Sequence, residues 1–529
     1  MHVKRKRLLA LTTAVVLSAA MLASGCSSSN GNGNGNSQGQ SAATESAGAA
    51  GSGAGEGTAA SEAPKADTSE FVKLKYYYTG PTSPGDDAVF AELNKRIKEK
   101  INANVEFIKV ASGDYTQKMS IMVNALEEFD LVFTSPYYLN YYDNASKGAF
   151  VDITDLLPVY APETYALFKP EIWDAARVNG KIYASINQQI FARQSGFSVQ
   201  KALADKYGFD PTTVKKLSDI APFLQSVKDG EPAETTDQLW NAQVKNQVFS
   251  YFYPAYEWES IGEIDLPGVV RSMEDNPKVF NEYETEEFKD FVLTNADFQK
   301  RGFIAKDTLT RPTFDPAKYV GTAMATLSPG VDATIAQTYK AEHYVIPMGS
   351  PMLTSANAIA TLTAVSATSK HPERALMFIE LLNTDKEIYN MLVWGLEGVD
   401  YVKTGDNRIE AVEGSSFKSQ AGWKFGNQFN SYVTGTQTDD VWEQTDELNK
   451  SAKMSKLFGF SFNPEQVKSE IANTMAIVAE YRQAFNAGMY GDDTEAKLQE
   501  YNQKLKSAGV DKIIAEKQRQ LDEFIAQKG

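Results

Sequence analysis

The first part of the chain with a regular hydrophobic pattern alternates polar and apolar residues. In residues 72–78, Lys73 and Lys75 separate apolar side chains, which is the period-two pattern of a strand. After a turn rich in glycine and proline, we expect Asp86 and Asp87 to cap a helix. In that helix the apolar residues recur at intervals of three and four, at Val89, Phe90, Leu93, Ile97 and Ile101. A second strand over 105–110 completes a strand, helix and strand unit, which predicts a parallel sheet with right-handed crossovers.

The pattern continues with a helix over 115–125 and a third strand over 130–134. In open sheets of this kind, ligands bind beyond the carboxyl ends of the strands. The loops after Tyr78 and Thr134 are therefore the first candidates for a binding site. Two further short strands are predicted, over residues 181–184 and 323–327.

The carboxyl-terminal part of the chain has a helical pattern. Asn463 is the expected N-cap, Pro464 the first helical residue, and Gln466 lies three residues after the cap. Apolar residues follow at helical spacing, at Val467, Ile471, Met475 and Val478. A last helix is predicted from Ile513, Ile514, Leu521, Phe524 and Ile525.

The amino terminus has the pattern of a targeting segment. Four basic residues, Lys4 to Arg7, precede an apolar stretch over residues 8–23, and this order predicts a secretory signal peptide over residues 1–25. Its end, Leu-Ala-Ser-Gly-Cys, resembles the bacterial lipobox, so Cys26 is the predicted lipidation site; an ordinary signal peptide with an incidental cysteine is the alternative. Cys26 is the only cysteine, so no disulfide can form within the chain.

Residues 26–69 consist mostly of Gly, Ser, Ala and Asn. Such a segment cannot bury a core, and we expect it to be a flexible tether between a lipid anchor and the folded part. The formal net charge is −16, which argues against nucleic acid or an anionic membrane surface as a partner. No later apolar run is long enough to span a bilayer.

Several motifs point to a known family. Residues 114–118 (DYTQK) precede FDLV at 129–132, NGKIYA occupies 179–184, and SKHPERA occupies 369–375. These stretches resemble the family 1 extracellular solute-binding proteins, the sugar-capturing lipoproteins of ABC importers. Residues 395–401 (GLEGVDY) and the run from Phe458 onward resemble the LipO-like subgroup of Gram-positive bacteria. Many relatives carry a proline after the NGKxYA strand, and here Ser185 and Ile186 follow instead.

The resemblance implies a fold class, a division into lobes and a partner. The fold would be α/β and of type II, the two-lobe periplasmic-binding-protein-like fold, in which each lobe is a sheet flanked by helices and the ligand cleft lies between the lobes. Residues 70–188 and 355–400 would form lobe 1, and residues 189–354 and 401–529 would form lobe 2. The protein would be a membrane-anchored extracytoplasmic monomer that passes its solute by hinge closure to the transmembrane subunits of an ABC permease.

Motifs for catalysis and metal binding fail on their context. The three histidines, His2, His343 and His371, do not have the spacing of a zinc site. Residues 35–39 match a nucleophile elbow but lie in the predicted tether. Residues 198–201 and 403–405 resemble parts of the penicillin-recognising enzymes in the wrong order. Acidic residues number 68, so pairs of the glycosidase kind are inevitable and uninformative. We expect no enzyme, no cofactor and no metal.

Aromatic residues beside amide and hydroxyl side chains suit a carbohydrate site, because sugar rings pack on aromatic planes while their hydroxyls need polar partners. Most single aromatics are nevertheless expected in the core. The candidate ligand-binding residues combine this chemistry with positions after predicted strands or in aromatic stretches: Thr79, Thr134, Ser135, Tyr137, Asn187, Gln188, Trp258, Trp394, Glu397 and Trp423.

The function that these patterns favour is capture of an oligosaccharide or a related carbohydrate for import. Two alternatives remain open at the level of the sequence. One is a surface-tethered glycoside hydrolase or lyase, and the other is a solute sensor that feeds a membrane kinase. The sequence does not identify the sugar, its linkage or its length.

Overall fold

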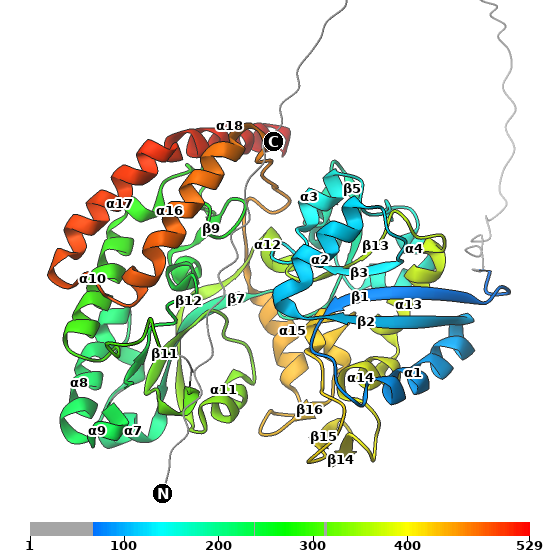
Figure 1. Ribbon diagram of the computed structural model, residues 1–529, viewed down its shortest axis with the longest axis horizontal. Helices are drawn as coiled ribbons and strands as arrows, with labels where there is room; N and C mark the ends of the chain where they lie inside the picture. The colour runs from blue at the N-terminus through cyan, green and yellow to red at the C-terminus, as the bar shows by residue number, and fades with distance from the viewer. Residues whose placement is uncertain (1–66, 237, 312–314, 529) are drawn as a thin grey trace, which may run out of the picture. The chain divides into compact units, whose positions relative to one another are not determined.

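The computed structural model describes residues 67–236, 238–311 and 315–528, and two five-stranded sheets organise this part of the chain (Figure 1). The predicted signal peptide, Cys26 and the predicted tether up to residue 66 lie outside the described residues. Within the described ranges, every helix is too short or too polar to cross a bilayer.

The first sheet has the order β2-β1-β3-β13-β6. Strands β1 and β2 are parallel over their whole length, and β3 pairs with β1 in parallel, which confirms the predicted parallel unit. Strands β13 and β6 are antiparallel to their neighbours, so the sheet is mixed. The bounds are β1 (Val72–Thr79), β2 (Ala103–Val110), β3 (Leu131–Thr134), β6 (Ala184–Ile186) and β13 (Leu362–Val365).

Helices cover both faces of the first sheet (Figure 1). On one face lie α1 (Asp86–Ile101), α13 (Pro372–Thr384) and α14 (Lys386–Trp394), and α2 (Ser112–Asn124) lies on the other. The apolar face of α1 is buried as its spacing predicts. Its N-cap is Gly85, however, and not Asp86. The Asp86 carboxylate instead accepts hydrogen bonds from the backbone N–H and hydroxyl of Ser83.

The second sheet has the order β17-β12-β7-β11-β8 and centres on two long antiparallel strands. The strand predicted over residues 323–327 corresponds to β11, which has four residues and begins slightly earlier. The bounds are β7 (Arg193–Gln200), β8 (Trp240–Asn241), β11 (Gly321–Met324), β12 (His343–Leu353) and β17 (Lys453–Met454). Packed around it are α7 (Lys201–Lys206), α8 (Ala221–Gly230), α9 (Ala233–Thr236), α10 (Glu286–Lys300) and α11 (Val331–Tyr339).

The carboxyl-terminal helices contribute to the core of the second sheet. They are α16 (Lys468–Asn486), α17 (Thr494–Ala508) and α18 (Val510–Lys528), and Tyr481, Phe485 and Tyr501 are buried with Phe288 of α10. Asn463 does not cap α16 as predicted. Its side chain accepts the backbone N–H of Glu465, which begins a separate short 3-10 turn before the helix.

Smaller elements complete the structure. A separate three-stranded sheet consists of β14 (Tyr401–Lys403), β15 (Arg408–Ala411) and β16 (Val433–Thr434). One hairpin consists of β9 (Trp258–Ser260) and β10 (Val269–Arg271), and another of β4 (Arg177–Val178) and β5 (Lys181–Ile182). Short helices are α3 (Tyr141–Ser146), α4 (Leu157–Tyr160), α5 (Pro162–Ala166), α6 (Pro170–Asp174), α12 (Ser355–Ala358) and α15 (Val441–Ser451).

The chain passes between the two sheets at residues 187–192 and 354–361, and again at α15. The side chain of Asn449 in α15 accepts the backbone N–H groups of Phe191 and Ala192 and donates to the carbonyl of Gln189. The predicted lobe boundaries stay a prediction. The core of the first sheet extends past residue 400, however, because Phe417, Phe425 and Phe458 are buried in it.

Candidate functional site

Four strand ends of the first sheet meet at one edge. Strands β1 and β3 are parallel and finish there at Thr79 and Thr134. Leu362, the first residue of the antiparallel β13, pairs with Thr134 on one side and with Ile186, the last residue of β6, on the other. This carboxyl edge is where the sequence predicts ligand binding, and residues 187–192 lead from it directly into the second sheet.

Thr79 and Thr134 are both buried at this edge. The Thr79 hydroxyl lies 2.8 Å from the hydroxyl of Ser112 in α2. The Thr134 hydroxyl donates to the carbonyl of Leu139 at 2.6 Å. The Ser135 hydroxyl accepts the backbone N–H groups of Tyr137 and Tyr138. The hydroxyls of Thr134 and Ser135 therefore shape the loop after β3, and that of Thr79 links β1 to α2.

Tyr137 is the exposed member of that loop. Its side chain is 51% exposed, while its backbone is fixed through Ser135. An exposed aromatic ring on a fixed backbone can stack on a sugar with little loss of conformational freedom.

Asn187 and Gln188 leave the edge at the end of β6 and hold a distant part of the chain there. The Asn187 amide donates to the carbonyl of Lys424 at 2.9 Å and accepts from the Thr363 hydroxyl at 3.2 Å. The backbone of Gln188 bonds to Gly426 and Gln428 at 2.8 and 2.9 Å. The buried Oε1 of Gln188 has no hydrogen-bond partner among the described residues, and a buried acceptor of this kind needs a partner.

Trp423 reaches the same edge from that distant segment. It lies in a 3-10 turn, Gly422–Lys424, and its carbonyl accepts the hydroxyl of Thr361 at 2.9 Å. The residue is 36% exposed, and the centroid of its indole lies 6.2 Å from the ring centroid of Phe133 in β3. The structure thus brings Trp423 together with the predicted residues Thr79, Asn187 and Gln188, although it follows them by more than two hundred positions.

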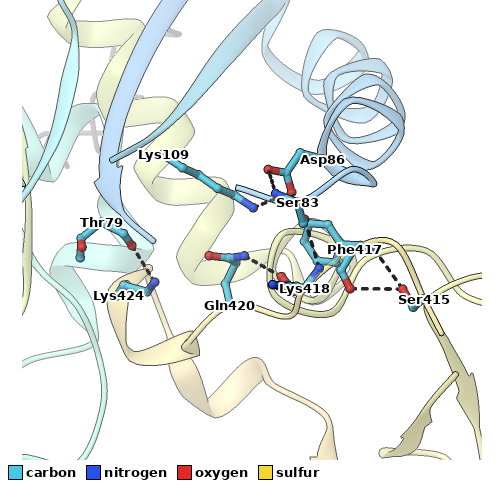
Figure 2. A network of polar contacts seen from close by, with 9 residues as sticks. All are labelled: Thr79, Ser83, Asp86, Lys109, Ser415, Phe417, Lys418, Gln420 and Lys424. Atoms are coloured by element: carbon cyan, nitrogen blue, oxygen red, sulfur yellow. Dashed lines mark hydrogen bonds and ion pairs between the residues drawn. The ribbon is translucent and has the colours of Figure 1, made fainter. Parts of the chain in front are cut away.

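Lys424 is a residue of this edge that the sequence analysis missed. Figure 2 shows its ammonium beside the end of β1, where it donates to the carbonyl of Thr79 at 2.7 Å. Burial, together with the charge of Lys109, lowers the pKa of Lys424 to about 8. Asp86, the carboxylate of this network, is paired with Lys109 at 2.6 Å. No hydrophobic pattern or motif around Lys424 indicates its position, because the partner of its ammonium is a backbone carbonyl more than three hundred residues away.

Three predicted contacts lie elsewhere. Trp258 is 2% exposed and packs within the core of the second sheet against Phe249 and Phe280, so it is a core residue. The indole of Trp394 donates to Ser431 at 3.0 Å. Glu397 forms an ion pair with Lys403 at 2.9 Å. In the sequence, the aromatic or acidic character of these residues does not show whether they lie at the carboxyl edge or elsewhere.

The second sheet presents polar groups where β7 begins. Arg193 is its first residue, and its Nε donates to the carbonyl of Ala325 at 3.4 Å. Tyr251, which is half-buried, donates to Gln243 at 3.4 Å. Gln243 also donates to Thr322 and to the carbonyl of Ala323 in β11. Six residues join Ile186 to Arg193, so the Cα atoms of these two residues are at most about 25 Å apart.

The chemistry of this arrangement is that of binding. Its groups are aromatic rings, amides, hydroxyls and cations, and Asp86 nearby is occupied by Lys109 and Ser83. Within the described ranges, no group of three or more His, Cys, Asp and Glu side chains is arranged to hold a metal ion.

Comparison with known families gives two matches. The family of bacterial extracellular solute-binding proteins matches residues 80–388. A domain family of unknown function matches residues 456–526, which include α16, α17 and most of α18.

Individual relatives agree with the first match. A carbohydrate ABC transporter substrate-binding protein of Streptococcus pneumoniae serotype 4 is 29% identical over 471 residues, covering 88% of this chain and 93% of the relative. The crystal structure of NgtS, an N-glycan transport solute-binding protein from S. pneumoniae, is 29% identical with a TM-score of 0.77, covering 87% of this chain and all of that one. The same protein in complex with Man1GlcNAc is similar with a TM-score of 0.71 and 28% identity, over 86% of this chain and all of that one.

Proposed function

We propose, from the premise that this chain belongs to the bacterial extracellular solute-binding proteins, that it captures an oligosaccharide and delivers it to an ABC permease. The membership rests on the family match, which covers more than half of the 529 residues. It confirms the family resemblance and the two-lobe α/β fold class that the sequence predicts. The chain is a solute-binding protein of an ABC transporter that acts outside the cytoplasm, and it is not an enzyme, so the hydrolase or lyase alternative is wrong.

The observation that carries the carbohydrate proposal is the set of groups at the carboxyl edge of the first sheet. Tyr137, in the loop after β3, and Trp423 are partly exposed aromatic residues, and Gln188, after β6, has a buried amide oxygen without a hydrogen-bond partner among the described residues. Flat C–H faces of sugars pack on such rings, and sugar hydroxyls bond to such amides. The relatives named above support this class, because their described ligands are carbohydrates.

Residue roles within this site are also proposed. Tyr137 and Trp423 would stack on sugar rings, and Gln188 would bond to a hydroxyl through its unpartnered oxygen. Thr79, Thr134, Ser135 and Asn187 would shape the edge through the bonds that they already make. Trp258 belongs to the core and is not part of this proposal. Trp394 and Glu397 remain candidate ligand contacts away from the carboxyl edge.

Calorimetry with the purified protein tests the proposal. Man1GlcNAc and Man5GlcNAc, the two glycans found in complexes of NgtS, are titrated separately, as are plant-wall and storage oligosaccharides. We expect at least one to bind with a Kd in the micromolar range or below, and to be recovered unaltered after prolonged incubation. Binding of peptides with no binding across the sugars would contradict the ligand class.

The membrane arrangement is proposed on the sequence alone. Cys26 would carry the lipid, and the tether that follows would let the binding protein reach the permease as a monomer. Replacing Cys26 with Ser should move the protein from the membrane fraction to the soluble extracytoplasmic fraction. Retention of the variant in the membrane fraction would speak against lipid anchoring at this residue.

A further inference from the structure

The segment 420–428 is fastened to the ends of two strands of the first sheet, β1 and β6. Lys424 bonds through its ammonium to the carbonyl at the end of β1, and through its own carbonyl to Asn187 after β6. Gly426 and Gln428 continue the attachment through the backbone of Gln188. The segment therefore belongs to the binding edge of the first sheet, although the sequence prediction places it in the other lobe.

Trp423 lies between these attachments. The Thr361 hydroxyl holds its carbonyl, and Lys424 is the next residue along the chain. Phe133 supports one side of the indole, and part of the ring remains exposed. A ring whose backbone is already fixed loses little conformational entropy when a ligand packs on it.

The burial of Lys424 needs a reason. An apolar side chain of similar length would fill the same space without removing an ammonium from water. The ammonium is 5.9 and 5.8 Å from the ring centroids of Trp423 and Phe425, and its hydrogen bond goes to a carbonyl rather than to a carboxylate. What the ammonium adds over an apolar side chain is this one directional bond, which links the turn carrying Trp423 to the end of β1 (Figure 2).

We propose that Lys424 is a positioning residue for carbohydrate binding, which sets the indole of Trp423 as a rigid platform through its bond to the Thr79 carbonyl. The inference rests on the proposed function and names a residue through which the binding edge acts. Lys424 does not itself need to touch the sugar. Its loss would leave Trp423 in place along the chain but free to move.

The test is a double-mutant cycle with Lys424→Met and Trp423→Ala. The probe is Man5GlcNAc, or the tightest-binding oligosaccharide of the panel if Man5GlcNAc does not bind the parent protein. We expect Trp423→Ala to raise the Kd about tenfold, as for the loss of one aromatic stack, and Lys424→Met to raise it several-fold. The double variant should bind no more weakly than Trp423→Ala, because Lys424 acts through Trp423.

Acrylamide quenching gives a second readout that a merely structural role would not move. The contribution of Trp423 is obtained as the difference between each protein and its Trp423→Ala counterpart. It should become more accessible to acrylamide in Lys424→Met. Lys424→Gln, which keeps a hydrogen-bond donor, should recover part of the affinity.

The matched control is Arg374→Met. Arg374 is also a buried cation bonded to backbone carbonyls, of Ile101 and Asn102 among others, but it lies at the opposite, amino end of β1. It should lower stability and leave the Kd unchanged. If Lys424→Met does not fold, Lys424→Gln and Arg374→Gln take the places of the two Met variants in the cycle.

The outcomes separate two failures. If no oligosaccharide binds the parent protein, the proposed function is wrong. If the parent protein binds and Lys424→Met leaves the Kd unchanged, or if the effects of Lys424 and Trp423 simply add, the positioning role is wrong.

Discussion

The side chains at the proposed binding edge fall into two groups, which differ in hydrogen bonding and exposure. The side chains of Thr79, Ser135 and Asn187 form hydrogen bonds within the protein. Tyr137 and Trp423, in contrast, are partly exposed. We propose that the first group gives the edge its shape and that the second offers surface to a ligand. A mutation in the first group should therefore affect both stability and binding, and one in the second mainly binding.

Glu259 is a residue whose ionisation should affect stability. Burial raises the pKa of this carboxyl from its usual value to about 7, although the Ser455 hydroxyl donates to it. The folded protein therefore binds more protons than the unfolded chain between about pH 4.5 and 7. The contribution of Glu259 to stability is largest below this window and is lost as the pH rises through it.

We predict that Glu259→Gln removes this loss. The gain in unfolding free energy of the variant over the parent protein should be larger at pH 8 than at pH 5, because Gln carries no charge at either pH. Urea unfolding of both proteins at the two pH values measures it. A gain that is the same at both would show that Glu259 does not titrate in this way.

Elements with a regular pattern are the ones that the sequence predicts well. Strands β1, β2 and β3 and helix α1 lie within a few residues of their predicted positions, because alternation and helical spacing report the buried face directly. Strand β7 was missed because Phe197 and Val199 are its only large apolar residues, although five successive residues are buried. Strand β12 contains Pro347, Gly349 and Pro351 around an irregular register, which in sequence resembles a loop.

The same limit explains the candidate site. Positions directly after strands, such as Thr79 and Asn187, were predictable once the strands were. Trp258 was not separable from Trp423 because both are aromatic residues in polar surroundings, and only packing shows that one is in the core. Lys424 required knowledge of which distant segment returns to the edge, which is a property of the tertiary structure.

Helix α18 is attached by a buried lysine to the loop between β9 and β10. The ammonium of Lys517 donates to the carbonyls of Leu266, Pro267 and Gly268 at 2.7 to 3.1 Å. Burial lowers the pKa of Lys517, while the charge of the buried Glu282 opposes that change. Glu282 in turn accepts the backbone N–H of Gly268 at 2.9 Å.

We predict that Lys517→Met lowers the unfolding free energy by about 3 kcal/mol, since it leaves carbonyls and a buried carboxyl without their cation. Urea unfolding measures the loss. Adding Glu282→Gln should recover part of it, because the uncompensated carboxyl is removed. Additive losses in the double variant would show that the two residues do not interact.

For the whole molecule, the relation between the two sheets depends on the passages between them. Asn449 fastens α15 to one of these passages through three hydrogen bonds. In binding proteins that close around a ligand, the residues of such passages absorb the change in backbone angles. A less constrained passage populates more open conformations and reduces the apparent affinity by the fraction that remains competent.

We predict that Asn449→Ala raises the Kd for the bound oligosaccharide and increases the radius of gyration of the ligand-free protein. Small-angle X-ray scattering with and without ligand measures the second effect. A saturating concentration of ligand should return the radius to that of the parent protein. Identical radii for the two ligand-free proteins would indicate that Asn449 does not restrain the passage.

The position of β13 inside the first sheet has a consequence for the order in which the protein forms. Strand β6 ends at residue 186, yet its partner in the sheet is β13, which begins at residue 362. The first sheet therefore cannot be completed before the chain has been synthesised as far as β13, even if its early strands have already paired. Non-local pairing of this kind slows folding. In a chain exported in the unfolded state, this strand order would delay completion of the first sheet until β7, β8, β11 and β12 of the second sheet have also left the cytoplasm.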